Sequence, residues 1–206
     1  MVRIKICGIT NKQDAIEASG LGADMLGFIL YKDSKRYIEP KKIRDVLNEV
    51  PDTIAKIGVF VDENAKKVIE IAQDCSFDML QFHGKESPEY CAQFKDSYKI
   101  IKAFRIQDKK SLEIINDYDV DYYLLDTHIG GLKGGTGKTF DWKLIEGYEL
   151  LRPVILSGGL TPENVGSAIQ NVAPYGVDVS SGVEASPGKK DLKLMKEFVD
   201  NVRKIA

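Results

Sequence analysis

Apolar and polar side chains alternate over short runs of this chain, and each run is followed by a segment with helical spacing. In the first run, residues 3–7, Ile4 and Ile6 share one face and Lys5 and Cys7 share the other. Gly8 ends the run, and a helix is predicted to begin shortly afterwards. The pattern therefore predicts a strand-then-helix unit at the start of the chain.

The same unit recurs eight times, without a linker or a low-complexity stretch between repeats. Strands are predicted at 3–7, 25–29, 54–60, 79–82, 98–103, 122–126, 153–156 and 177–179, and helices at 12–19, after Pro40, at 64–74, from Ser87, at 109–116, at 141–148, from Thr161 and at 192–204. Eight such units predict a single (β/α)8 barrel domain of the α/β class over residues 1–206. An open doubly wound sheet is the alternative, but no G-x-G-x-x-G follows the first strand.

Composition narrows the possible partners. The chain has 206 residues, is 43% hydrophobic and carries a net charge of −2, which gives no reason to expect a nucleic-acid or membrane partner. A strand begins by residue 3, so no signal peptide is expected. Three scattered cysteines favour a reducing cytoplasm. Neither His83 nor His128 has metal-ligand spacing to another residue, so no metal site is predicted.

Side chains suited to acid–base chemistry stand at the ends of several predicted strands. Cys7 ends the first strand, His83 follows the fourth and Asp126 ends the sixth. The carboxyl ends of barrel strands form the active-site face of such folds, so Cys7 and Asp126 are a candidate acid–base pair. A helix capped by Thr10 or Asn11 would lie beside Cys7 and could make its thiol more acidic. The alternatives are a buried structural cysteine and an aspartate that caps a helix or forms an ion pair.

Small residues follow the last two strands. Ser157-Gly158-Gly159 and Ser180-Ser181-Gly182 are turns of the kind that bring backbone N–H groups to a phosphate in barrel enzymes. The alternative is that these glycines only make tight turns. Two such turns at the correct strands favour a phosphorylated small-molecule ligand.

Arg36 and Asp178 have two interpretations each. Arg36 lies in a charged loop and is either solvated or a fork for a carboxylate. Lys5 shares the face of Cys7, so its ammonium would be buried and need a partner. Asp178 on the neighbouring eighth strand is the candidate partner, unless it contacts ligand hydroxyls instead.

Motifs in order along the whole chain resemble one family. They are KICGIT (5–10), SKRYI (34–38), GVF (58–60), HG (83–84), LD (125–126), GGTGK (134–138), FDW (140–142), SGGL (157–160), PENV (162–165), DVSSGVE (178–184) and PG (187–188). Together they are similar to the phosphoribosylanthranilate isomerases of tryptophan biosynthesis. One departure is Phe82 before His83-Gly84, where the family usually has leucine, a change that should affect packing and not chemistry.

The resemblance implies a cofactor-free Amadori rearrangement with Cys7 as general base and Asp126 as general acid. It also implies that Arg36 holds the anthranilate carboxylate and that the loops after strands six to eight bind the phosphate. The protein would be a monomer or a homodimer, and His83 and Lys138 have no assigned role. The rival interpretations are another sugar-phosphate barrel enzyme and a barrel that only binds a phosphorylated ligand.

Overall fold

Eight parallel strands close into a barrel in the computed structural model, which describes residues 1–126 and 148–205. Each strand pairs with its neighbours in chain order, and β1 pairs with β8 to complete the barrel. This confirms the predicted (β/α)8 fold. The strands are β1 (Arg3–Cys7), β2 (Met25–Ile29), β3 (Ala55–Phe60), β4 (Met79–Phe82), β5 (Lys99–Arg105), β6 (Tyr122–Asp126), β7 (Val154–Ser157) and β8 (Gly176–Val179).

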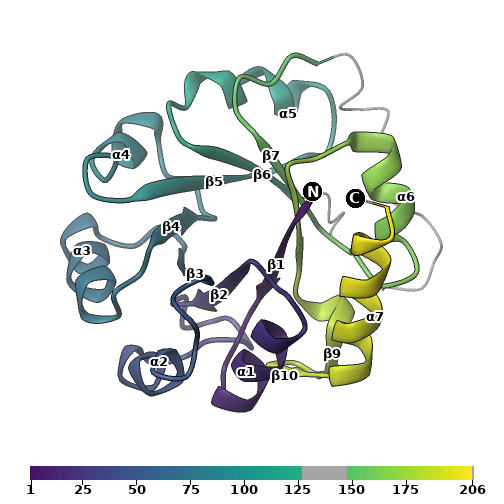
Figure 1. Ribbon diagram of the computed structural model, residues 1–206. Helices are drawn as coiled ribbons and strands as arrows, with labels where there is room; N and C mark the ends of the chain where they lie inside the picture. Colours follow the sequence, from purple (N-terminus) through teal and green to yellow (C-terminus); the bar gives the residue numbers. More distant parts are fainter. Residues whose placement is uncertain (127–147, 206) are drawn as a thin grey trace.

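Helices surround the barrel (Figure 1). They are α1 (Lys12–Gly20), α2 (Pro40–Leu47), α3 (Ala65–Asp74), α4 (Pro88–Ala92), α5 (Lys110–Glu113), the 3-10 turn η1 (Ile115–Asp117), α6 (Val165–Val172) and α7 (Leu192–Arg203). Asn11 caps α1 by accepting a hydrogen bond from the Asp14 N–H. Of the two caps that the sequence predicted, Thr10 and Asn11, the structure has Asn11. None of these described helices is long and apolar enough to cross a membrane.

Two predicted helices differ in the structure, and one predicted region cannot be compared. The helix expected at 109–116 is the short α5 followed by the 3-10 turn η1. The helix expected from Thr161 begins at Val165, because the Asn164 side chain accepts a 2.8 Å hydrogen bond from the Thr161 N–H and holds those residues in a turn. The glycine-rich segment 130–137, Lys138 and the helix predicted at 141–148 lie outside the described residues, apart from Tyr148.

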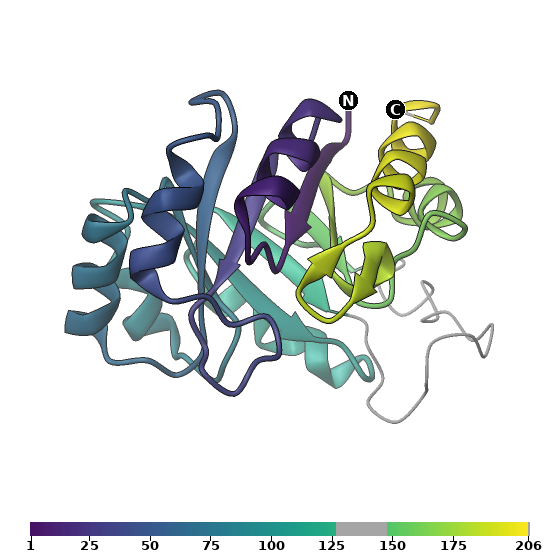
Figure 2. The same ribbon diagram turned by 90° about the horizontal axis from the view of Figure 1, so that it is seen from below.

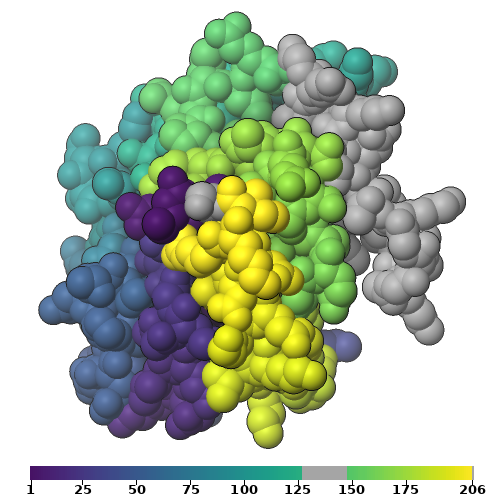
Figure 3. Space-filling model, turned by 45° about the vertical axis from the view of Figure 1, so that its right-hand side comes forward, coloured from purple at the N-terminus to yellow at the C-terminus, as the bar shows by residue number. Residues whose placement is uncertain are grey.

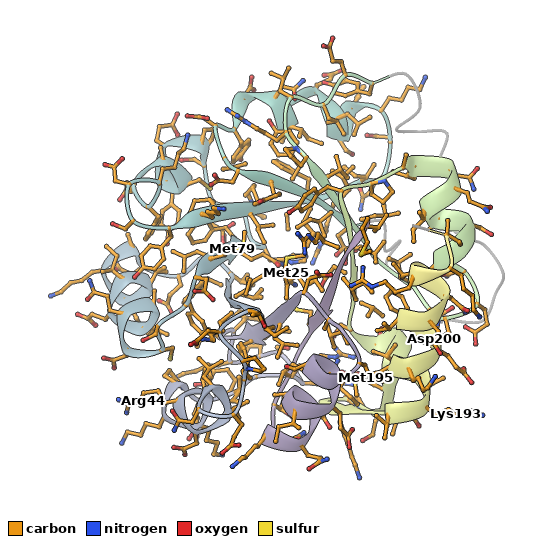
Figure 4. The ribbon with its side chains drawn as sticks, viewed as in Figure 1. Met25, Arg44, Met79, Lys193, Met195 and Asp200 are labelled. Carbon is orange, nitrogen blue, oxygen red and sulfur yellow. The ribbon has the colours of Figure 1, made fainter. Side chains whose placement is uncertain are left out.

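Alternation along the strands divides the core into two clusters. Ile4 and Ile6 of β1 pack outward against the helices, in the larger cluster. A smaller cluster, which includes Cys7 and Leu124, fills the barrel interior. In Figure 4, Met25 and Met79 of this inner cluster lie near the barrel centre. The side of β1 that carries Lys5 and Cys7 therefore faces inward, as the alternation predicts.

A short hairpin that the sequence pattern did not predict lies beside the mouth of the barrel. Its strands are β9 (Glu184–Ser186) and β10 (Lys189–Lys190), which precede α7 in the chain and can be followed in Figure 2. The Lys190 N–H donates a 2.8 Å hydrogen bond to Asp14, and Thr10 donates to the Gly188 carbonyl. These contacts hold the hairpin against the turn that follows Cys7.

The two ends of the described chain meet at the opposite end of the barrel. Figure 3 shows the C-terminal helix lying against the N-terminal segment, and Figure 2 shows both termini at one end. Arg203 of α7 donates to the Val2 carbonyl at 2.8 Å and to Asp24 at 2.9 Å. The end at which the strands finish is therefore left for the candidate site.

Candidate active site

The predicted acid–base residues lie at the carboxyl ends of their strands. Cys7 is the last residue of β1 and is 5% exposed. Asp126 is the last residue of β6, and 18% of its side chain is exposed. Ser157 ends β7, and Asp178 lies within β8. The barrel thus brings to one rim residues that are far apart in the sequence.

Gly27 makes room for the Cys7 side chain. Parallel pairing sets Gly27 of β2 directly beside Cys7 of β1. A Cβ built on Gly27 would lie 2.7 Å from the Cys7 Sγ and 3.1 Å from the Lys5 Nζ. Any larger residue at position 27 would therefore collide with both atoms. The Cys7 sulfur and the Lys5 ammonium lie against the same point of the barrel wall.

The electrostatic environment of Cys7 differs from the simple prediction. Burial raises the pKa of the Cys7 thiol above its ordinary value, while Lys5 and Lys190 lower it and Asp178 raises it further. The expectation of a more acidic thiol, based on the helix after β1, is therefore wrong. Desolvation outweighs the nearby positive charges.

Lys5 is fully buried inside the barrel and pairs with Asp178. The Lys5 Nζ donates to the Asp178 Oδ1 at 2.8 Å, and the Ser157 hydroxyl donates to the other carboxylate oxygen at 3.0 Å. Burial lowers the pKa of Lys5, but Asp178 and Cys7 raise it by more. The predicted Lys5–Asp178 partnership is therefore present. Both oxygens of Asp178 are engaged within the chain, and the residue is 5% exposed.

Asp126 contacts a histidine that the sequence left without a role. The His83 Nε2 lies 3.3 Å from the Asp126 Oδ2, and the His83 Nδ1 lies 2.9 Å from the Gln81 Nε2. Gln81 is buried on β4, and its Oε1 has no partner among residues 1–126 and 148–205. His83 is therefore positioned to orient the Asp126 carboxyl group from the β4 side of the mouth.

Arg36 belongs to a cluster of charges that sequence reasoning missed. Its Nε and Nη2 donate to the two carboxylate oxygens of Glu184 at 2.8 and 2.7 Å. The buried Lys190 Nζ donates to the same carboxylate at 2.9 Å and to the Ser180 carbonyl at 3.1 Å. Two cations thus share one anion, which leaves a net positive charge beside the mouth. Lys190 stands in a Gly-Lys-Lys run that resembles solvated surface, so no sequence signal indicated its burial.

The two predicted phosphate turns have conformations that require small residues. Gly158 and Gly159 have φ angles of 90° and 69°, which side chains disfavour. A Cβ on Gly182 would lie 1.9 Å from the Leu160 carbonyl oxygen, so Gly182 lets the two turns pack together. The Ser180 hydroxyl is buried without a hydrogen-bond partner in the described parts of the chain. Ser181, which follows it, is exposed.

Another buried ion pair, Lys102–Glu86, lies away from Cys7. The Lys102 Nζ contacts the Glu86 carboxylate at 3.0 Å and the Gly84 carbonyl at 2.9 Å. Glu86 in turn accepts hydrogen bonds from the Gly84 and Asp62 N–H groups. This pair fixes the turn after β4 that carries His83.

Fold and side chains together define a (β/α)8-barrel protein with a thiol, a carboxyl group and glycine turns at the carboxyl ends of its strands. Its sequence matches the family described as N-(5'phosphoribosyl)anthranilate (PRA) isomerase over residues 4–201. The chain belongs to this family.

Similar proteins support the assignment over the full length. An N-(5'-phosphoribosyl)anthranilate isomerase of Pelobacter propionicus is 44% identical over 97% of this chain and 94% of its own length. The crystal structure of the Thermotoga maritima phosphoribosyl anthranilate isomerase is 45% identical, covers 99% of this chain and 100% of its own, and superimposes with a TM-score of 0.93. A second structure, of a phosphoribosyl anthranilate isomerase in complex with reduced 1-(o-carboxyphenylamino)-1-deoxyribulose 5-phosphate, is 41% identical, covers 99% of this chain and 100% of its own, and has a TM-score of 0.89.

Proposed function

We propose that this protein isomerises N-(5'-phosphoribosyl)anthranilate to 1-(o-carboxyphenylamino)-1-deoxyribulose 5-phosphate, with Cys7 as general base and Asp126 as general acid. The observation that carries the proposal is the placement of these two residues at the ends of β1 and β6, on the rim that also bears the two glycine turns. The 41% identical relative with a reduced form of this product supports the choice of substrate.

Asp126 would act first. The furanose ring oxygen must gain a proton before the ring opens, and a protonated carboxyl group can supply it. His83, at 3.3 Å, holds the carboxyl group from one side. Ring opening yields a Schiff base whose C2 hydrogen is acidic.

Cys7 would act second, as a thiolate that removes the C2 proton. The enolamine that results then tautomerises to the ketone. Each of the two proton transfers contributes roughly 10² to 10⁴ in rate. Because the reaction only redistributes protons within one molecule, no cofactor enters the proposal.

Substrate binding would use the charges and turns around the mouth. Arg36 would bind the anthranilate carboxylate, and Glu184 would hold its guanidinium in place from the opposite edge. The turns that contain Gly158, Gly159, Ser180, Ser181 and Gly182 would hold the phosphate. The packing of the two turns supports this, because Gly182 lets them lie against each other at the Leu160 carbonyl.

The sequence left two roles for Asp178: a partner for Lys5 or a contact with ligand hydroxyls. Its oxygens already bind Lys5 and Ser157. We therefore place Asp178 beneath the substrate, where it holds Lys5, in preference to a direct contact with ligand hydroxyls.

The proposal covers setting and assembly as well. The chain would act as one barrel domain in the cytoplasm on a small phosphorylated substrate, without nucleic acid or membrane. It would be a monomer or a homodimer. A relative from Thermotoga maritima with 41% identity and a TM-score of 0.88 is described as dimeric, with monomers generated from it.

The test is turnover of N-(5'-phosphoribosyl)anthranilate, followed by the loss of anthranilate-type fluorescence. The proposal predicts turnover by the purified protein without added metal or cofactor. Product binding without turnover would favour a barrel that only binds its ligand. Turnover of a different sugar phosphate, with none of this substrate, would favour another isomerase.

A further inference from the structure

A lysine buried directly below the proposed base is not explained by the acid–base pair. Lys5 stands two residues before Cys7 on β1, so both side chains point into the barrel. Most of the barrel interior around it is apolar, with residues such as Ile57, Ile101 and Ile155. A buried charge in such surroundings is costly unless it is paired.

Stability alone gives a poor reason for the Lys5–Asp178 pair. A buried ion pair is often no more stabilising than apolar residues of similar volume. The location of the pair is more informative: register sets Asp178 beside Lys5 and Gly27 beside Cys7. The Lys5 ammonium and the Cys7 sulfur then approach the same point on Gly27, at 3.1 and 2.7 Å from a Cβ built there.

We propose that Lys5 is a positioning residue for the general base: Asp178 holds its ammonium against Cys7, where it stabilises the thiolate that removes the substrate proton. This inference rests on the proposed function of Cys7. Lys5 keeps its own protons throughout. The Cys7 proton passes to water when the thiolate forms, and the thiolate then takes the C2 proton from the substrate.

The other charges around Cys7 support this role. Asp178 of β8 faces it with a negative charge, and Lys190 of β10 and Arg36 of the loop after β2 face it with positive charges. Arg36 and Lys190 are tied to Glu184. Among these charges, Lys5 lowers the pKa of the Cys7 thiol most, which opposes the larger effect of burial.

The experiment measures the pH dependence of Cys7 alkylation by iodoacetamide in the protein without substrate, with mass spectrometry of the Cys7 peptide. An opposite charge at this range lowers a pKa by about 1 to 3 units. We therefore expect Lys5→Met to move the alkylation midpoint up by at least about one unit. At neutral pH, alkylation should slow by about tenfold or more.

A double variant guards against a folding defect. Lys5→Met alone leaves the Asp178 charge buried without its partner, whereas Lys5→Met/Asp178→Asn removes both charges. Its midpoint should lie between those of the wild type and Lys5→Met, because the effect of Lys5 on the thiol exceeds that of Asp178. A wild-type midpoint in the double variant would overturn the proposal, since Lys5 would then only neutralise Asp178.

The buried Lys102–Glu86 pair supplies a matched control. Lys102→Met/Glu86→Gln also removes a buried ammonium and its carboxylate, but Lys102 acts on the Cys91 thiol. This variant should leave the Cys7 midpoint unchanged. A shift equal to that of the Lys5 double variant would overturn the proposal, because any buried charge would then have the effect.

Alkylation is read without turnover, so this test and the test of the function can fail separately. If Lys5→Met leaves the alkylation midpoint unshifted, the role of Lys5 is rejected, while Cys7 can still be the base. If Cys7→Ser is active, Cys7 is rejected as the base, while the effect of Lys5 on the Cys7 thiol can still be measured.

Discussion

Adding one methyl group at Gly27 tests whether the position of the Cys7 sulfur controls the rate. Gly27 lacks the positive φ that would by itself penalise a side chain, so Gly27→Ala acts through space alone. The new Cβ would meet the Cys7 Sγ at 2.7 Å, the Lys5 Nζ at 3.1 Å and the Cys7 Cα at 3.2 Å. The sulfur and the ammonium must therefore both move.

The size of the effect follows from these distances. Ordinary van der Waals contact begins at 3.4 Å, so the sulfur, at 2.7 Å, must retreat by at least about 0.7 Å. A misplacement of about 1 Å can lower a rate by about 10², which corresponds to about 2.7 kcal/mol in the activation free energy. The overpacking itself should lower the free energy of unfolding by about 1–3 kcal/mol.

The assay compares kcat/KM, product affinity and thermal unfolding for Gly27→Ala and the wild type. Product affinity should change little, because the phosphate turns are untouched. Gly20→Ala at the end of α1 is the matched control, since its Cβ would meet nothing within 4 Å. It should keep full activity and gain up to about 1 kcal/mol of stability. Activity of Gly27→Ala within threefold of wild type would refute the argument that the sulfur has one productive position.

Three further predictions concern the acid Asp126, the carboxylate fork Arg36, and Asp24 at the contact between the two ends of the chain. Asp126→Asn cannot donate an acidic proton, so turnover should fall by roughly 10² or more with product affinity within a few fold; a near-normal rate would assign ring opening elsewhere. Arg36→Met should weaken binding of ligands with the anthranilate carboxylate more than of analogues without it, and an equal loss in a titration would contradict this role. Burial alone would raise the pKa of Asp24, but hydrogen bonds from Ile4, Arg3 and Arg203 lower it below its ordinary value of 3.8. Asp24→Asn should therefore lower the free energy of unfolding, measured with denaturant at neutral pH, by about 1–2 kcal/mol. The difference between the variant and the wild type should disappear as the pH falls below 3.8 and through the lowered pKa of Asp24. A difference that stays constant with pH would contradict this prediction.

The barrel and part of the site follow from local pattern. Alternation on β1 places Lys5 and Cys7 inside, and the closed parallel order places Asp178 beside Lys5. These features depend on the two-residue alternation of side chains along a strand and on the pairing of the first and last strands in a closed barrel. Both can be predicted from the sequence. The small residues after β7 and β8 are likewise visible, although the contact between Gly182 and the Leu160 carbonyl is not.

The remaining parts of the site depend on contacts between distant segments. Glu184 and Arg36 are separated by 148 positions, and only the fold of the hairpin brings them together. Lys190 is buried because that hairpin packs against Asp14 at the start of α1. The pKa of the Cys7 thiol could not be predicted either, because its direction depends on how burial compares with several charges from other strands.

The most direct test of the account is the activity of Cys7→Ser. Serine preserves the geometry, but its hydroxyl is far less acidic than a thiol, so almost no anionic base remains at neutral pH. Turnover of N-(5'-phosphoribosyl)anthranilate and affinity for its product are measured side by side. The account predicts a folded variant that binds product and is nearly inactive. Turnover within tenfold of the wild type would contradict the assignment of Cys7 as the base.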